Sequence, residues 1–543
     1  MARTSIFKLP ANGEPIVDAL TNGTYWVLDG TPTVTWAVAD APGIDWKWNP
    51  YGAAMMRDAM SSVLSKYAEV ANIRFEYVGW FDDQRTAPAD IVLAATLFPA
   101  NLWMPSSVYA WAYFPYEPGT DAQIAGMFGS SEAYPNASGD VILNYSNYEI
   151  SNSTFTPGSN GYFALLHEVG HAVGLKHPHD NGGTLGRPTF EEIGFNDADN
   201  QILTIMSYDP ATSLAVWFQR FGLPTRAGYP ESLMPLDILA LQSIYGPNMT
   251  TRAGSDVYEL YNDESIETFW DAGGEDAVTA YDSFFGWNIF AVSMSEFENL
   301  VVAIPDDWNT NTGKFFFNIE NFVGSEYNDS IIATPAANFI GGLGGNDNLA
   351  GLGGDDTIFG GLGLDIADYI WSMAAHTVYR QSNGWIVESE SGVSGIDTLI
   401  DVERLRFTDV SVALDLSGNA GTVAKILGAV FGREAVFNEE YAGIGLYFMD
   451  AGMTYESLMQ LAIDARLGAG ASHEAVVDLL YTNVVGVPPG DADQAYYVRL
   501  LDTNVYTVAS LGVMAADIDL NLVNIDLVGL AQQGLEYAPY EGG

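Results

Sequence analysis

The chain has 543 residues, a formal charge of −49 from 69 acidic and 20 basic residues, and no cysteine. This acidity argues against nucleic acids and anionic membrane surfaces as partners, because both are negatively charged. The lack of cysteine excludes disulfides and a thiol nucleophile, while the length allows three domains with proper cores.

The first quarter of the chain predicts mixed strands and helices. Residues 33–38 alternate apolar and polar side chains as a strand does, and residues 51–70 have the apolar spacing of an amphipathic helix. Residues 1–20 contain no apolar stretch of signal-peptide length, and no apolar run is long enough to span a bilayer.

The most informative motif is H-E-x-x-H-x-x-G-x-x-H, which begins at His167. His167 and His171 are four residues apart, so on a helix both imidazoles project from one face and can bind the same ion. Gly174 lets the helix end and the chain turn back, so that His177 can supply a third ligand. Glu168 can reach a metal-bound water. Three ligands with one open position are the catalytic form of a zinc site.

This motif resembles that of the metzincin metalloproteases, and Pro178 after the third histidine resembles the serralysin branch. Residues 204–208, Thr-Ile-Met-Ser-Tyr, resemble the methionine turn that lies beneath the metal in that family. Met206 is expected to be a packing floor, because thioethers prefer softer metals. The resemblance implies that Tyr208 is an additional zinc ligand that swings away when substrate binds. A packed ring with a bonded hydroxyl is the alternative.

Two further segments carry the resemblance. Ala89-Asp90-Ile91 resembles the edge strand of the serralysins, and residues 235–242 resemble the last helix of their catalytic domain. His179 and Asp180 are expected to be solvated loop residues, with a hydrogen bond from Asp180 to a ligand as the alternative.

The resemblance implies a zinc endopeptidase that hydrolyses peptide bonds without a covalent intermediate. Zinc would lower the pKa of a bound water, with Glu168 as the general base that later protonates the leaving amine. Tyr208 would donate a hydrogen bond to the developing oxyanion. The catalytic residues predicted are therefore Glu168 and Tyr208.

Residues 252–256 and 270–276 resemble a calcium site that serralysins have just after the catalytic domain. Two ordinary acidic turns are the alternative. The ligands implied are the carbonyls of Arg252, Gly254 and Gly273 and the carboxylates of Asp256, Asp271 and Asp276.

Residues 324–368 form five units of nine residues, with an apolar residue at the eighth position of the first four units and alanine in the fifth. The pattern resembles the repeat-in-toxin nonapeptide, which forms a parallel β-roll with calcium in its loops. A flexible Gly/Asp linker is the alternative. The second unit is degenerate, with Asn338 in place of aspartate. We expect two or three ions, held in the loops by Gly342, Gly344, Asp347, Gly351, Gly353, Asp356, Gly360 and Asp365.

After a predicted strand at 397–407, the pattern becomes helical. Residues 424–432 resemble 479–486, and residues 447–450 resemble 497–502, which indicates two copies of a unit offset by 52 to 54 residues. The arrangement resembles a helical domain of unknown role that is appended to bacterial repeat-in-toxin and surface-layer proteins.

The predicted fold class is multidomain α+β. Residues 1–248 are expected to form a metzincin catalytic domain and residues 249–415 a parallel β-roll/β-sandwich calcium-binding domain. Residues 416–543 are expected to form an all-α C-terminal domain.

Calcium-binding loops need an environment richer in calcium than a cytosol, so we predict an extracellular protein with Zn²⁺ and Ca²⁺ as cofactors. The resemblance implies export by type I secretion machinery, although residues 535–543 depart from the family's usual export signal. The predicted partners are protein or peptide substrates, and a bacterial surface layer bound through the C-terminal domain. The alternative function is a surface-layer-associated or matrix-binding scaffold with a non-proteolytic protease fold.

Overall fold

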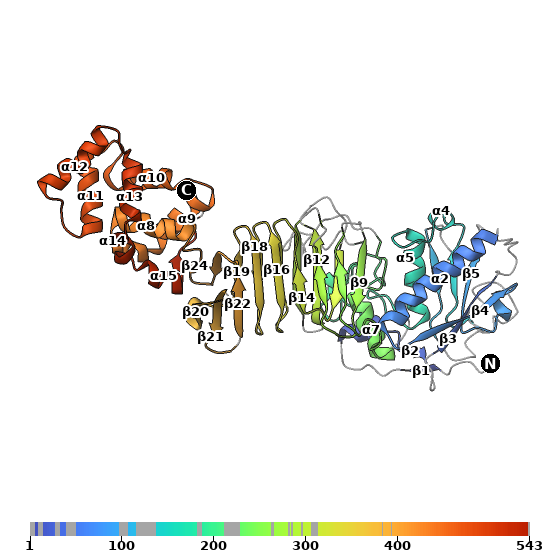
Figure 1. Cartoon of the computed structure of the whole chain (residues 1–543). Helices are drawn as coiled ribbons and strands as arrows, with labels where there is room; N and C mark the ends of the chain where they lie inside the picture. The colour runs from blue at the N-terminus through green and yellow to red at the C-terminus, as the bar shows by residue number, and fades with distance from the viewer. Residues whose placement is uncertain are drawn as a thin grey trace. The chain divides into compact units, whose positions relative to one another are not determined.

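The computed structural model describes most of the chain, and its contacts divide the chain into two compact units. The first unit comprises residues 1–256, 261–276 and 292–319; the second comprises residues 257–260, 277–291 and 320–543. Figure 1 shows both units coloured along the chain. The residues described are 6–8, 15–27, 33–39, 50–96, 107–115, 137–181, 187–210, 229–261, 265–280, 283, 286–294, 297–305, 313–382, 384–392 and 394–540.

The first unit contains a five-stranded sheet with the order β4-β3-β5-β7-β6. The first four of these strands are parallel and β6 is antiparallel to β7. Ala89 and Asp90 directly precede β5, which lies between β3 and β7, so the prediction of an edge strand there was wrong; β4 and β6 form the edges. The strands are β3 (Thr33–Ala39), β4 (Arg74–Phe81), β5 (Ile91–Thr96), β6 (Ala110–Ala112) and β7 (Val141–Asn144).

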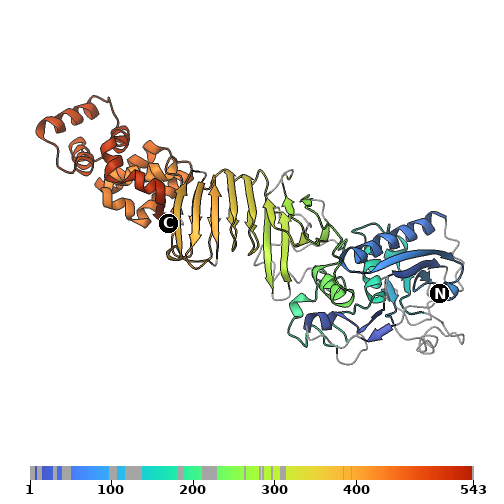
Figure 2. The same cartoon turned by 60° about the horizontal axis from the view of Figure 1, so that its bottom comes forward.

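Two helices, α2 (Pro50–Val70) and α5 (Asn160–Ala172), pack against each other and contact this sheet (Figures 1 and 2). The helix predicted at residues 51–70 and the strand predicted at 33–38 are therefore confirmed. The other elements of this unit are β1 (Ile6–Lys8), α1 (Pro15–Leu20), β2 (Thr24–Trp26), α4 (Tyr148–Ser151), α7 (Pro235–Tyr245), β9 (Ile266–Trp270), β12 (Phe297–Pro305), β13 (Gly313–Phe317) and 3₁₀ turns at Gln84–Thr86 and Asn196–Ala198.

The second unit contains two stacks of parallel strands that form a roll. In each stack the register advances by 18 residues, two nonapeptides, as in Asn321↔Phe339↔Thr357 and Ser330↔Asn348↔Ile366. The eighth-position side chains, including Ile340 and Leu349, are fully buried between the stacks. One stack contains β8 (Val257–Glu259), β10 (Ala277–Thr279), β14 (Asn321–Val323), β16 (Phe339–Gly344), β18 (Thr357–Leu362) and β22 (Ile396–Ile400). The other contains β15 (Ser330–Ile332), β17 (Asn348–Ala350), β19 (Ile366–Asp368) and β23 (Arg404–Arg406), with β11 (Trp287–Met294) paired to β15.

The roll continues beyond the last nonapeptide. The hairpin β20 (His376–Gln381) and β21 (Gly384–Ser389) follows β19, and the chain then adds β22 to one stack and β23 to the other. The predicted strand at 397–407 is therefore two short strands that belong to different stacks. A short 3₁₀ turn, Met373–Ala375, precedes the hairpin.

Helices follow in two similar groups. Helices α8 and α11 begin 54 residues apart (473 − 419), and α9 and α12 begin 52 apart (491 − 439), which are the offsets predicted from the repeats. Their apolar faces form one core with α10 and α13. The bounds are α8 (Asn419–Phe431), a 3₁₀ turn Arg433–Phe437, α9 (Glu439–Asp450), α10 (Tyr455–Leu467), α11 (His473–Val485), α12 (Asp491–Asp502), α13 (Val508–Asp517), α14 (Asp519–Asn524) and α15 (Leu527–Gln533).

The prediction that this C-terminal segment is all-α was wrong. Strand β25 (Leu535–Tyr537) pairs antiparallel with β24 (Ser411–Ala413), so the end of the chain joins the sheet that carries β23 (Figure 2). The mixed α+β class is confirmed. The boundaries 1–248, 249–415 and 416–543 remain predictions.

Arg404 of β23 joins the roll to the helices. Its guanidinium, almost fully buried, donates to Asp415 at 2.5 Å and to Asp450 of α9 at 2.7 Å. Asp415 also accepts from the backbone nitrogen of Asn419 at the start of α8. One buried cation therefore neutralises two carboxylates from different segments.

We expect Arg404→Ala to lower the unfolding free energy of the second unit by about 3–5 kcal/mol, because it leaves two carboxylates without their cation. Arg406→Ala is the matched control, since Arg406 lies on the same strand but pairs with Asp368 at the surface, where a pair contributes about 1 kcal/mol or less. Denaturant unfolding followed by circular dichroism measures both. Equal effects of the two substitutions would contradict the role given to Arg404.

Candidate metal centre

Helix α5 positions the first two histidines. Ser159 caps its N-terminus by accepting a hydrogen bond from the Tyr162 nitrogen, and the residues from Gly161 to Ala172 are all buried. The helix ends because Gly174 adopts a φ of +108° and a Cβ there would lie 2.5 Å from the Thr24 carbonyl oxygen. The reversed chain brings His177 back to the helix.

The three histidines meet at their Nε2 atoms. The Nε2 atom of His177 lies 3.1 Å from that of His167 and 3.0 Å from that of His171. Each Nδ1 has an acceptor on its other side: the Ile205 carbonyl, the Leu175 carbonyl and the Asp180 carboxylate, all within 2.8 Å. A carbonyl cannot donate, so Nδ1 of His167 and of His171 must carry the proton.

This arrangement fits a cation. The Nε2 atoms of His167 and His171 present lone pairs, and burial lowers the pKa of both rings, that of His167 to about 3, so they stay neutral at physiological pH. Lone pairs facing one another repel unless a cation lies between them. Ligands of a tetrahedral zinc ion at ~2.0–2.1 Å lie roughly 3.3 Å apart, close to the separations seen here.

Residues 204–206 form the floor of the centre. Met206 is fully buried, and a Cβ at Gly170 would lie 2.6 Å from its sulfur, so a glycine is needed where the helix crosses it. The Ile205 carbonyl is the acceptor that orients His167. Asp237 of α7 fixes this turn in place by accepting from the Thr204 hydroxyl at 2.6 Å and the Ile205 nitrogen at 2.8 Å.

Glu168 follows His167 on α5, and the ring of Tyr208 packs beside those of His167 and His177. Glu168 is buried, which raises its pKa to about 8. Tyr208 is exposed, with its ring centroid 4.5 Å from that of His177 and 5.7 Å from that of His167. Burial of the hydroxyl end, and then the charge of Glu168, raise the pKa of Tyr208 to about 12, so its hydroxyl remains a hydrogen-bond donor at neutral pH.

The loop residues after His177 contact the candidate centre, although they were expected to be solvated. Asp180 accepts from His177 Nδ1 at 2.7 Å, which is the alternative raised for it. The His179 ring stacks on His177 with centroids 5.0 Å apart and a 7° interplanar angle. Asp199 lies 3.6 Å from His179 Nδ1 and accepts from the Ser207 hydroxyl.

The acidic turns after α7 come together in the first unit. A carboxylate oxygen of Asp256, of Asp271 and of Asp276 all lie within 4.8 Å of one another. Asp276 accepts from the Asp256 nitrogen at 2.7 Å, and Asp271 accepts from the Gly273 nitrogen at 2.8 Å. The predicted carbonyl ligands lie in the same turns, where Arg252 has a φ of +46° and a Cβ on Gly274 would clash with the Gly254 carbonyl.

In the roll, the sixth-position aspartates use their two oxygens differently. Oδ1 of Asp347 accepts from the Asp329 nitrogen at 2.8 Å, and Oδ1 of Asp365 accepts from the Asp347 nitrogen at 2.9 Å. Asp356 does the same for Asn338. The Oδ2 atoms of Asp347, Asp356 and Asp365 are buried and have no hydrogen-bond partner.

Glycines and carbonyls surround these free oxygens. A Cβ on Gly342 would clash with Asp347 Oδ2 and approach the Gly360 carbonyl, and Gly351 stands in the same relation to Asp356. A Cβ on Gly360 would clash with the Asp401 carbonyl. Buried carboxylate oxygens that lack a donor, with backbone carbonyls beside them, are a ligand set that suits calcium. Gly344 ends β16, and Gly353 lies in the turn before β18.

Sequence reasoning missed several of these residues. Asp397 and Glu403 accept from the nitrogens of Asp356 and Asp365 and so extend the two ladders beyond the nonapeptides. Their own segments lack the glycine-rich pattern, so the nonapeptide search could not identify them. Asp237 lies in the helix predicted at residues 235–242, and no local pattern indicates its contacts with residues 204 and 205.

The fold and the histidine centre define the chain as similar to zinc metalloproteases of the H-E-x-x-H type. Serralysin of Proteus mirabilis is 26% identical over 363 residues, which cover 64% of this chain and 61% of the relative. Metallopeptidase AprA of Pseudomonas marginalis is 29% identical over 42% of this chain and 46% of its own, and Serralysin C of Dickeya chrysanthemi is 32% identical over 36% and 41%.

The chain is therefore a relative of the serralysin-type metalloproteases, which confirms the resemblance predicted from its motifs. It spans less than two thirds of the length of these curated relatives. No protein-family model matches it. Among the helices described, none is long and apolar enough to cross a membrane.

Substitution of Asp237 tests whether this residue fixes the turn beneath the histidines. Asp237→Ala leaves the buried donors of Thr204, Ile205 and Met234 without an acceptor, each at a cost of ~1–3 kcal/mol. We expect a loss of at least about 3 kcal/mol in the unfolding free energy of the first unit, and weaker zinc binding in competition with a chelator. Asp237→Asn is the control, because an amide oxygen can still accept from both backbone nitrogens.

The same residue predicts a pH dependence. Burial raises the pKa of Asp237 to about 7, while in the unfolded chain it ionises near pH 4. The contribution of Asp237 to the unfolding free energy is therefore full below pH 4 and is lost as the pH rises toward 7. We expect the stability of Asp237→Asn to fall less than that of the native chain between pH 5 and 7.5. Parallel pH profiles would contradict the raised pKa.

The aspartates of the roll predict how calcium changes stability at different pH values. Burial first, and neighbouring carboxylates after it, raise the pKa of Asp347 and of Asp356 to about 7. Without calcium, the stability of the roll should then fall as the pH rises from 5 to 8, because the unfolded chain ionises these groups near pH 4. Calcium should raise the thermal midpoint more at pH 8 than at pH 5. An equal shift at both pH values would contradict a role for these carboxylates.

Proposed function

We propose that the chain is a secreted, calcium-stabilised zinc endopeptidase. The observation that carries the proposal is that three Nε2 atoms converge beside a buried glutamate. The other ring nitrogen of each imidazole, Nδ1, is already hydrogen-bonded. The relation to the serralysins supports it. His167, His171 and His177 would hold the ion, with Tyr208 as the fourth, movable ligand.

When bound, zinc would polarise the scissile carbonyl and lower the pKa of a water toward neutrality. Glu168 takes the proton from that water at its carboxylate and later gives it to the leaving amine. Burial raises the pKa of Glu168 to about 8, which supports the part of this role in which the carboxyl holds the proton before it passes to the amine. Tyr208, still protonated at neutral pH, donates to the developing oxyanion.

The calcium ligands proposed are those predicted, with two additions. The upstream site comprises the carbonyls of Arg252, Gly254 and Gly273 with the three clustered carboxylates. The roll sites comprise the free oxygens of Asp347, Asp356 and Asp365 with the loop glycines, and Asp397 and Glu403 close the last turn. Export by type I machinery and attachment to a surface layer through the helices remain part of the proposal.

The decisive experiment replaces Glu168 with glutamine. We expect zinc to stay bound, because the three histidines are unchanged, and peptide hydrolysis to fall by about 10²–10⁴-fold, because only proton transfer is lost. Tyr208→Phe should cause a smaller loss, about tenfold, from one missing hydrogen bond. The measurements are metal content and hydrolysis of casein by the zinc- and calcium-loaded protein.

The alternative, a non-proteolytic scaffold, predicts a different result. The loaded native chain would then show no casein hydrolysis and no sensitivity to a zinc chelator. If Glu168→Gln instead keeps its activity, the chain would still be a protease, but Glu168 would not be its general base.

A further inference from the structure

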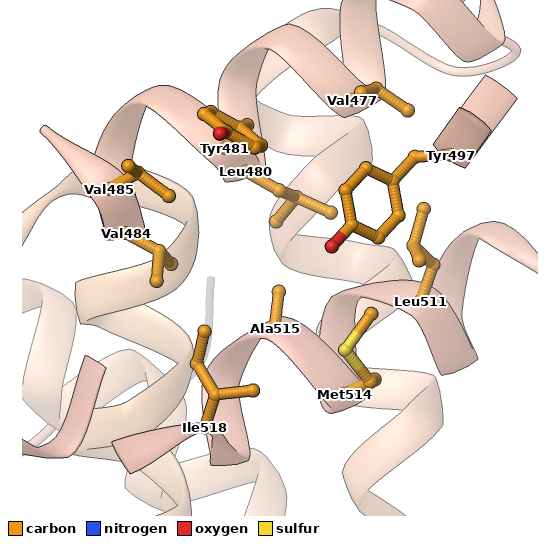
Figure 3. A pocket seen from close by; sticks show the side chains of 10 residues that line it. All are labelled: Val477, Leu480, Tyr481, Val484, Val485, Tyr497, Leu511, Met514, Ala515 and Ile518. Carbon is orange, nitrogen blue, oxygen red and sulfur yellow. The ribbon is translucent and has the colours of Figure 1, made fainter. Parts of the chain in front are cut away.

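The helical segment contains an apolar pocket between α11, α12 and α13. Figure 3 shows side chains of α11 facing those of α13 across it, while the ring of Tyr497 enters from α12. Of the lining side chains, Val484 and Leu511 are buried, whereas Val485 and Ile518 are exposed. The remaining lining residues are Val477, Leu480, Tyr481, Met514 and Ala515.

The size of the pocket excludes most small-molecule ligands. Its cavity volume is about 70 Å³, whereas pockets for cofactors and drug-sized molecules measure roughly 300–1,000 Å³. A space of this size takes one or two apolar side chains. Buried apolar anchors set in a small pocket are the usual centre of a protein interface.

The charges around the pocket favour a cationic partner. Residues 473–524 contain one basic residue, Arg499, against seven acidic ones: Glu474, Asp478, Asp491, Asp493, Asp502, Asp517 and Asp519. Exposed Asp493 accepts from the hydroxyl of Tyr481, which lines the pocket, while Asp517, next to Ile518, is paired with Lys425 at 2.9 Å. A second copy of a chain with a charge of −49, or an anionic membrane, would be repelled from this rim.

We propose that this pocket docks a cationic amphipathic helix of a partner protein, which inserts apolar side chains between α11 and α13 and places lysine or arginine over the acidic rim. Recognition by helix-in-groove packing needs this combination of an apolar seam and complementary flanks. The proposal is independent of the zinc centre, which lies in the other unit.

The test uses the full chain loaded with zinc and calcium. The probe is a fluorescein-labelled peptide of leucine and lysine with its leucines at helical spacing, and its binding is followed by anisotropy. A peptide of the same composition in shuffled order tests whether charge alone suffices. We expect the amphipathic peptide to bind at least about tenfold more tightly than the shuffled one.

Two variants and a matched control locate the binding. Ala515→Phe fills the pocket, and Val485→Asn replaces an apolar contact of its lining with a polar side chain without changing the charge. Both should weaken binding about tenfold. Val528→Asn makes the same substitution at an exposed position of α15 that does not line the pocket, and it should bind as the native chain does. Circular dichroism checks that the helices are retained, and Val485 is exposed enough to tolerate the change.

Several results would overturn the proposal. Equal binding of both peptides, or of all variants, would show that only the overall charge attracts the probe. Self-association of the native chain that Val485→Asn abolishes would assign the pocket to a second copy. Binding to vesicles of anionic lipid that Ala515→Phe abolishes would assign it to a membrane.

Discussion

The candidate centre depends on three hydrogen bonds at the far side of the imidazoles. Because the Ile205 and Leu175 carbonyls and the Asp180 carboxylate each face an Nδ1, the three Nε2 atoms are turned toward one point. A histidine motif alone does not secure this, since each ring could otherwise rotate or present its other nitrogen. The acceptors come from a turn after the helix, a loop and a buried floor, so the fold as a whole fixes the ligand geometry.

The sequence predicted those features of the centre that depend on residues close together in the chain. The i, i+4 spacing of His167 and His171, and a glycine where the helix must end, depend only on helix geometry. Asp237 could not be predicted in its role, because 32 residues separate it from Ile205 and only the packing of α7 brings them together. The edge strand was misplaced for a similar reason: strand order depends on tertiary pairing, which a local apolar pattern does not specify.

The roll shows the same limit. Its period could be predicted because every ninth residue must enter a core only one side chain wide, and Ile331, Ile340 and Leu349 do so. Its length could not be predicted. The hairpin β20–β21 separates Asp356 from Asp397 by 41 residues instead of 18, so the period is lost in the sequence although the hydrogen-bond ladder continues. Strand β25 was missed because three residues carry too little periodicity against a helical background.

The excess of acidic residues has two physical roles in the second unit. In the roll, one oxygen of Asp347, Asp356 and Asp365 accepts a backbone hydrogen bond and the other is buried without a hydrogen-bond partner, an arrangement that suits a bound cation. Around the helical pocket the carboxylates lie mostly at the surface, where water solvates them and their charge acts on approaching molecules. Calcium can satisfy the first group but leaves the second unchanged. The cationic partner proposed for the helical pocket would therefore meet the same surface charge whether or not calcium is bound in the roll.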